Sequence, residues 1–244
     1  EYVLERIVKE LNVQFNTRKQ LLLKTLYAYI ANSSALDDLD CFSMFGTNSF
    51  NLVWEKVCAE VMDNQLQKPI GGLRLPVPLA EQYRDMRHKK LIELIDKPQW
   101  SGTAPNGELF VKQAEDTLIP DLISIVNVDG VYQFIIFDAK YYNIQLEHNK
   151  KLRGQPGIES ITKQYLYQLA YQPFVEAHQI STVRNCFLMP TASAEIVAKG
   201  TASLSMLRAL GLQDIQVRLL PAALMFEYYL TNRKLDICTL KLVH

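Results

Sequence analysis

The chain of 244 residues carries no net charge, because 26 Lys and Arg residues balance 26 Asp and Glu residues. Hydrophobic residues make up 48% of it, which is enough for one large domain or two small ones. No apolar run approaches the ~20 residues of a membrane-spanning helix. The neutral balance also excludes a strongly basic nucleic-acid-binding domain, so any basic surface must be local.

Cysteine usage and the N-terminus indicate the compartment. The four cysteines are scattered and form no CxxC pair, which disfavours a zinc site and favours buried free thiols in a reducing environment. No signal peptide is recognisable. We therefore expect a cytoplasmic protein.

The first part of the chain is predicted to be helical. Residues 2–11 and 18–31 have the apolar spacing of amphipathic helices, and a loop rich in Ser and Asp follows. We divide the chain into an N-terminal helical region, 1–44, and a larger domain, 45–244. The larger domain opens with a helix over 50–62, whose apolar residues recur with the helical period.

The next segment is predicted to be mostly irregular. Gly and Pro residues at 65–80 indicate a loop with short extended pieces. Residues 91–95 are β-capable and are predicted to form an edge strand. Residues 98–107 are predicted to form a turn region.

A β-hairpin over residues 119–142 is the strongest local prediction. Two β-rich runs flank the pair Asp129–Gly130, which is typical of a two-residue turn. Such a turn fixes the register so that opposed residue numbers sum to 259, which places Asp121 directly across from Asp138. Opposed Cβ atoms lie roughly 4.5–5.5 Å apart. Both strands carry apolar residues on both faces, which is typical of strands inside a covered sheet.

Two facing carboxylates at a strand end destabilise a sheet unless something compensates their charge. A hard divalent cation would do so, and Lys140 points from the same strand face as Asp138. The cluster Asp121, Asp138 and Lys140 therefore predicts a metal site with a basic residue beside it. The alternative is an ordinary sheet end with solvated charges.

The remaining elements predict the fold class. A polar loop over 143–157 is followed by a helix over 158–175 and a strand over 184–189. A short helix over 203–210, a strand over 215–219 and a final helix over 221–230 complete the chain. This order predicts an α/β (α+β) domain with a mixed central sheet flanked by helices.

Candidate groups around the acid pair come from the neighbouring elements. Glu55 lies at the edge of the apolar face of the helix over 50–62, where it is either a solvated carboxylate or a third acidic group. The loop and helix that follow the hairpin offer Lys150, Lys151, Arg153 and Lys163 as candidate phosphate contacts. Gln164 and Gln168 share one helix face and could point toward the site.

Phosphodiester hydrolysis is the chemistry that suits these groups. Nucleotide-binding, serine-hydrolase and zinc-protease motifs are absent from the sequence. Asp121 and Asp138 would hold Mg²⁺, with the carbonyl of Ala139 as a third oxygen ligand and Glu55 completing the shell. Lys140 would orient or deprotonate the attacking water, and Gln164 or Lys163 would fix a water or a phosphate oxygen.

The segments Ile119-Pro120-Asp121 and Asp138-Ala139-Lys140-Tyr141-Tyr142 resemble the PD-(D/E)xK nuclease superfamily, in particular LlaJI-type restriction endonucleases, relatives of the McrC nuclease subunit. The helix with Trp54-Glu55 resembles the one that supplies the family's first acid, with Glu60 as the fallback. The family's Gln-x-x-x-Tyr motif is not met cleanly, so the choice between Gln164 and Gln168 stays open.

The resemblance implies a restriction-endonuclease-like core and a Mg²⁺-dependent DNA endonuclease of a prokaryotic restriction system, with Mn²⁺ as a substitute. It implies double-stranded DNA as substrate and a McrB-like AAA+ GTPase as a candidate partner; a homodimer is a further candidate assembly. The alternatives are a non-cleaving module that binds DNA or a motor subunit on a nuclease fold, and a repair or recombination nuclease.

Overall fold

The computed structural model describes residues 2–13, 17–33 and 49–242 and consists of two units, Glu1–Asn48 and Ser49–His244. The first unit contains helices α1 (Tyr2–Val13) and α2 (Thr17–Ser33), where two helices are predicted. The predicted boundary at residues 44 and 45 lies outside the described residues. None of the described helices is long and apolar enough to cross a membrane.

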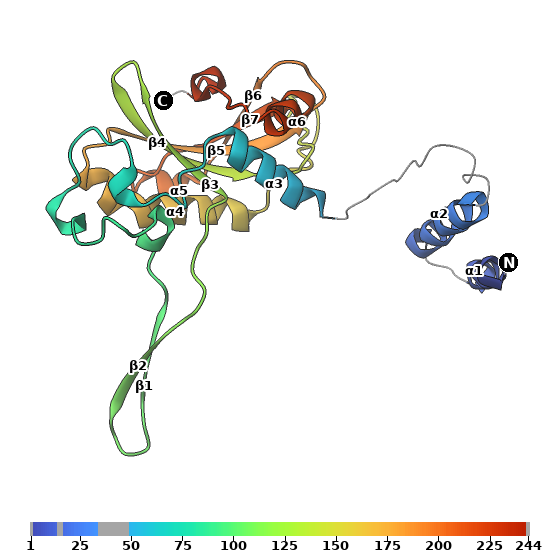
Figure 1. The fold of residues 1–244 in the computed structure, drawn as a ribbon, viewed down its shortest axis with the longest axis horizontal. Coiled ribbons are helices and arrows are strands. Elements are labelled where there is room, and N and C mark those ends of the chain that lie inside the picture. Colours follow the sequence, from blue (N-terminus) through green and yellow to red (C-terminus); the bar gives the residue numbers. More distant parts are fainter. Residues whose placement is uncertain (1, 14–16, 34–48, 243–244) are drawn as a thin grey trace. The chain divides into compact units, whose positions relative to one another are not determined.

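The second unit contains a five-stranded sheet, a separate two-stranded ribbon and the helices around them (Figure 1). Its elements in chain order are α3 (Phe50–Val61), the 3₁₀ helices η1 (Ile70–Gly72), η2 (Glu81–Tyr83) and η3 (Leu91–Leu94), β1 (Gln99–Thr103), β2 (Leu109–Gln113), β3 (Leu122–Val128), β4 (Val131–Ala139), α4 (Ile158–Ala177), β5 (Thr182–Thr191), β6 (Val197–Ala202), α5 (Ser205–Arg208), β7 (Ile215–Pro221), α6 (Ala222–Leu230) and η4 (Ile237–Leu240).

The large sheet has the strand order β3-β4-β5-β7-β6. Strands β4, β5 and β7 run parallel, and the edge strands β3 and β6 pair antiparallel to their neighbours. Helix α4 makes the crossover that the parallel strands β4 and β5 require. The predicted mixed sheet flanked by helices, the core expected of a restriction endonuclease, is confirmed.

The predicted hairpin register is confirmed from Val128 opposite Val131 to Leu122 opposite Phe137. The two strand faces enter different cores. Ile135 and Phe137 pack with helices α3 and α6, whereas Phe134 and Ile136 pack with α4. Because helices cover both faces, the apolar residues alternate between two cores and the polar residues at the strand ends lie beside helices.

Two local predictions are wrong, and one strand of the large sheet was not predicted. Residues 91–94 form the 3₁₀ helix η3, because the Glu93 side chain accepts the Lys90 backbone N–H at 2.6 Å and closes a helical turn. The predicted turn region at 98–107 contains β1, and β6 was not predicted. Both strands have mostly exposed or half-buried side chains, so neither has a strong apolar period.

Cys58 and Cys186 are buried free thiols as predicted, Cys238 is exposed, and Cys41 lies outside the described residues.

Candidate active site

The two predicted acids meet where β3 begins and β4 ends. A carboxylate oxygen of Asp121 accepts the backbone N–H of Ala139 at 2.8 Å, so the fold fixes Asp121 across from the end of β4. Asp138 is 5% exposed, and its carboxyl group lies within hydrogen-bonding reach of the Asp121 carboxyl group. The antiparallel register therefore brings two acidic groups together at one end of the sheet.

Lys140 completes this group. Its Nζ lies 2.7 Å from Oδ1 of Asp138, and its side chain is mostly buried. The pKa of Asp138 is raised to about 7, first by burial and then by the hydrogen bond and charge of Asp121, while Lys140 partly offsets this rise. Burial also acts to lower the pKa of Lys140, but the hydrogen bond to Asp138 and the charges of Asp138 and Asp121 outweigh it and raise that pKa. Lys140 is therefore an ammonium group at neutral pH.

Two residues that the sequence did not mark as site residues hold the segment that carries Asp121. The Tyr167 hydroxyl of α4 donates to the Ile119 carbonyl at 2.9 Å. Asn64 donates to the Asp121 carbonyl at 3.3 Å and accepts the backbone N–H of Ile123 at 3.0 Å. The segment is thus bound from α4 and from the chain after α3. A sequence signal exists only for Tyr167, which shares a helix face with Tyr171.

Helix α4 places the two candidate glutamines, Gln164 and Gln168, differently. Gln164 is fully buried and donates from Nε2 to the Ile136 carbonyl at 2.6 Å, two residues before Asp138. Its Oε1 has no hydrogen-bond partner among the described residues. Gln168 instead accepts from Asn185 at 2.7 Å and from the Gln213 backbone at 3.1 Å. Of the two, Gln164 contacts the strand that carries Asp138, and its role in the site stays a prediction.

Helix α3 is anchored to the same end of the sheet. The Leu188 carbonyl of β5 accepts both the backbone N–H of Lys140 at 2.9 Å and the indole N–H of Trp54 at 3.1 Å. Glu55 follows Trp54 on α3 and is half-buried. The fallback residue Glu60 instead lies in an exposed ion pair.

Among the residues that the structure describes, no third acid joins the pair to form a metal-binding group. The described residues contain no group of three or more His, Cys, Asp or Glu side chains that could hold a metal ion. Glu55 as a metal ligand therefore stays a prediction.

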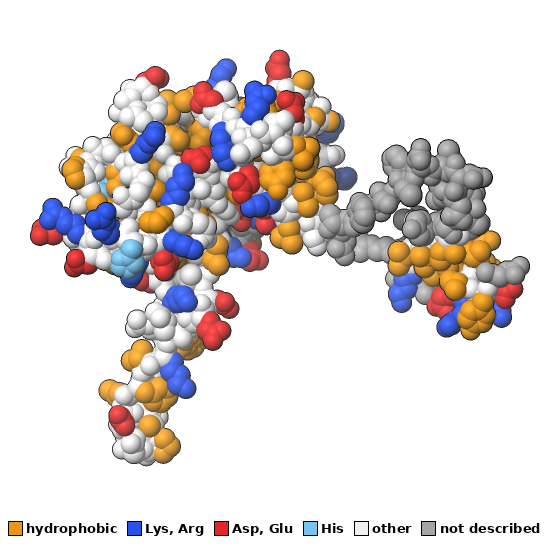
Figure 2. Space-filling model, in the orientation of Figure 1, with side chains coloured by type: hydrophobic (Ala, Val, Ile, Leu, Met, Phe, Trp, Pro, Cys, Tyr) orange, Lys and Arg blue, Asp and Glu red, His pale blue; other side chains and the backbone are white. Residues whose placement is uncertain are grey.

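The candidate phosphate contacts lie beyond the site residues in the chain. Lys150, Lys151 and Arg153 are exposed in the loop between β4 and α4, and Lys163 lies on α4. Lys150 and Lys163 form ion pairs of 2.6 Å with neighbouring carboxylates, and such surface pairs are weak. On the face shown in Figure 2, Lys and Arg side chains are interspersed with Asp and Glu.

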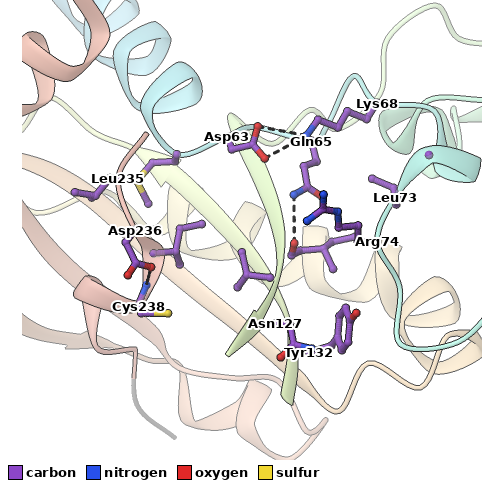
Figure 3. Close-up of a pocket in the computed structure, with 15 residues that line it drawn as sticks. Asp63, Gln65, Lys68, Leu73, Arg74, Asn127, Tyr132, Leu235, Asp236 and Cys238 are labelled. Carbon is purple, nitrogen blue, oxygen red and sulfur yellow. Dashed lines mark hydrogen bonds and ion pairs between the residues drawn. The ribbon is translucent and has the colours of Figure 1, made fainter. Parts of the chain in front are cut away.

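A cavity of about 630 Å³ lies elsewhere on the hairpin, beside the half of β3 that approaches the turn (Figure 3). Its lining combines charges of both signs, among them Asp63, Lys68, Arg74 and Asp236. Neither Asp121 nor Asp138 lines it. The acid pair therefore lies outside this cavity, and we do not place the chemistry there.

Comparison with known proteins identifies the family. A family model described as LlaJI restriction endonuclease matches residues 1–76 and 82–222, which include both acids, Lys140, Glu55 and Gln164. The chain belongs to the LlaJI restriction endonuclease family.

A relative of this chain is the Type II restriction enzyme BsuMI component YdjA of Bacillus subtilis (strain 168), which is 28% identical over 228 residues. The match covers 93% of this chain and 42% of that relative, so the chain spans less than half of the relative's length. No solved structure matches.

Proposed function

We propose that this member of the LlaJI family is an endonuclease that cleaves DNA by Mg²⁺-dependent hydrolysis of internal phosphodiester bonds. The observation that carries the proposal is the contact of Asp121, Asp138 and Lys140 at one end of the sheet. Family membership supports a restriction system, and DNA as the substrate. The same arrangement of two acids and a lysine supports a PD-(D/E)xK nuclease core.

The donor set fits a hard divalent cation. One carboxylate oxygen of Asp121 accepts the Ala139 N–H, and the same carboxyl group lies beside that of Asp138, so one cation could contact both groups. Burial, and after it the neighbouring Asp121 carboxyl group, raise the pKa of Asp138 more than Lys140 lowers it, and a bound cation would favour the ionised form. Both carboxylates and the Ala139 carbonyl offer the oxygen ligands that Mg²⁺ and Mn²⁺ prefer, and Glu55 would add a fourth. When bound, the cation would stabilise negative charge on the phosphate and activate a water molecule.

The residues around the acids would position the substrate. Lys140, as an ammonium group, orients the attacking water by hydrogen bonding and stabilises the charge that develops on the phosphate. The unpartnered Oε1 of Gln164 can accept a hydrogen bond from an ordered water beside β4. Lys150, Lys151, Arg153 and Lys163 bind backbone phosphates and carry no base specificity.

A partner subunit belongs to the same proposal. The relative is named a component of a restriction enzyme, so we expect this chain to act with other subunits. The resemblance to McrC-type nucleases points to a McrB-like AAA+ GTPase, which would supply the nucleotide hydrolysis.

The decisive experiment compares cleavage of double-stranded DNA by the wild type, Asp121→Ala, Lys140→Ala and their double variant. Assays contain Mg²⁺ or Mn²⁺, with and without the other subunits of the system. We expect cleavage only by the wild type and by the control Asp116→Ala, which removes an exposed carboxylate from the segment between β2 and β3. Cleavage by the folded double variant would disprove the site. Salt-sensitive DNA binding without cleavage under every condition would instead indicate a binding module.

A further inference from the structure

The ribbon formed by β1 and β2 projects from the second unit and lies outside its cores (Figures 1 and 2). Its base is closed by the hydrogen bond of the Ala114 N–H to the Pro98 carbonyl at 2.8 Å. Nine of its ten strand residues are exposed and the tenth is half-buried. An isolated two-stranded hairpin is only marginally stable in water, so a ribbon of this kind needs something to pair with.

Both faces of the ribbon carry exposed apolar side chains. Trp100 (70% exposed) and Phe110 (43%) share one face, and Leu109 (78%) and Val111 (64%) share the other. Together they expose roughly 500 Å², divided about equally between the two faces of the ribbon. The ribbon contains one basic and one acidic residue, Lys112 and Glu108, so its charge does not favour nucleic acid.

The outer edge of β2 is open for strand pairing. The Ala104 N–H donates to the Glu108 carbonyl at 2.8 Å, and the Ala114 N–H closes the base, so the even-numbered residues of β2 bond to β1. The alternation of an antiparallel ladder then turns the N–H and C=O groups of Leu109 and Val111 away from β1. Such a row of backbone groups is a template for another strand.

The sequence of β2 is complementary to itself when it is reversed. In the segment Glu108-Leu109-Phe110-Val111-Lys112, an antiparallel copy centred on Phe110 places Glu108 opposite Lys112 of the second copy. The same register places Leu109 opposite Val111 of the second copy, and these are the residues with outward backbone groups. Opposite charges across a ladder stabilise it by about 0.2–1 kcal/mol each, and a two-fold axis forms every such pair twice.

We propose that β2 pairs with β2 of a second copy of this chain, antiparallel about a two-fold axis at Phe110, to form a four-stranded intermolecular sheet. Four strands exceed the minimum for independent stability. The sheet joins Leu109 and Val111 of both copies into one apolar face, and Phe110 and Trp100 of both copies into the other. The proposal concerns assembly and does not depend on the proposed cleavage.

One consequence does rest on the proposed function. Each copy carries one group of Asp121, Asp138 and Lys140, whereas a duplex has two strands to cut. A two-fold dimer supplies two such groups related by the symmetry of the duplex backbone.

Sedimentation equilibrium of the whole chain tests the pairing by charge exchange. Glu108→Lys or Lys112→Glu creates two like-charge contacts per dimer, and we expect either to weaken dimerisation about tenfold or more. The double variant Glu108→Lys/Lys112→Glu restores opposite charges with wild-type composition, and we expect it to dimerise within about threefold of the wild type. The ribbon lies outside the cores, so thermal unfolding of all variants should match the wild type.

A wild type that stays monomeric at about 100 µM, well above the weak dissociation constants expected of such a small interface, would overturn the proposal. A double variant that dimerises as weakly as the single variants would also overturn the proposal. A loss of DNA binding in Lys112→Glu, without any dimer in the wild type, would assign the ribbon to DNA instead.

Cysteine crosslinking tests the position of the axis. Phe110 faces its own symmetry mate in a pair with closely spaced side chains, so Phe110→Cys should form a disulfide-linked dimer under mild oxidation. Trp100→Cys, on the outer strand of the same sheet, is the matched control and should not. Equal crosslinking of the two variants, at the level that the native cysteines alone give, would contradict the pairing.

Discussion

Substitution of Asp138 by Asn should change how the stability of the metal-free protein depends on pH. The pKa of this carboxyl group is about 7 in the folded protein, against 3.8 for the unperturbed group. Between these values the folded protein holds a proton that the unfolded chain has lost, so stability falls as pH rises from about 4 to about 7 and is flat above. A shift of this size corresponds to a loss of roughly 4 kcal/mol of unfolding free energy.

Urea denaturation in EDTA from about pH 4 to about pH 8.5 measures the free energy of unfolding of the wild type and of Asp138→Asn, with the fluorescence of the buried Trp54 as a probe of the second unit. We expect the wild type to lose stability with rising pH relative to Asp138→Asn. The difference between the two proteins isolates the one group from the other titrating residues. Equal pH dependence of the two would refute the reasoning, because it would show that Asp138 ionises as it does in the unfolded chain.

Added metal extends the same experiment. At pH 8 the ionised carboxylates bind Mg²⁺, and a concentration 100 times Kd stabilises the folded state by about 2.7 kcal/mol. We expect this rise in the wild type and its loss in Asp138→Asn. Equal stabilisation of both would place the metal elsewhere.

Three further substitutions test the surroundings of the site. Tyr167→Phe removes the hydrogen bond to the Ile119 carbonyl, and we expect it to lower the free energy of unfolding in urea by about 1 kcal/mol and the Mg²⁺ affinity several-fold. An unchanged Mg²⁺ affinity would show that this hydrogen bond does not position Asp121. Asn64→Ala removes hydrogen bonds at the start of β3 and should lower the free energy of unfolding by about 2–3 kcal/mol. A loss below about 0.5 kcal/mol would show that these hydrogen bonds do not hold the segment that carries Asp121. Gly154→Ala places a Cβ against the Asn143 carbonyl at a φ of 64°, which distorts the loop between β4 and α4. We expect this variant to bind DNA more weakly in fluorescence anisotropy, with the same Mg²⁺-dependent shift of Tm as the wild type. Unaltered DNA binding would show that this loop does not contact DNA.

Local patterns predicted most of the elements that position the site. The Asp129–Gly130 turn fixed the register, and the register placed Asp121 opposite the end of β4 without any knowledge of the fold. The apolar period of α3 and the long helix α4 were also predictable, because both bury one face against the sheet. The sequence did not reveal β1, β2 or β6, whose exposed side chains carry little periodicity.

The surroundings of the acids were less predictable. Asn64 and Tyr167 are far in the sequence from Asp121 and Ile119, to which they donate hydrogen bonds. No local spacing in the sequence therefore predicts these contacts. Helical spacing alone did not distinguish the candidate glutamines Gln164 and Gln168 of α4. They differ in the structure because β4 lies under Gln164, whereas Asn185 of β5 meets Gln168.

By itself, the sequence determined the pair Asp121 and Asp138, the lysine two residues later and the family to which they point. Those features depend on short-range geometry: a two-residue turn and the alternation of side chains along a strand. Only the tertiary structure decided how deeply Asp138 is buried, and hence its raised pKa, because burial depends on helices that pack from distant parts of the chain. The tertiary structure also left the β1–β2 ribbon outside every core, which exposes a self-complementary strand.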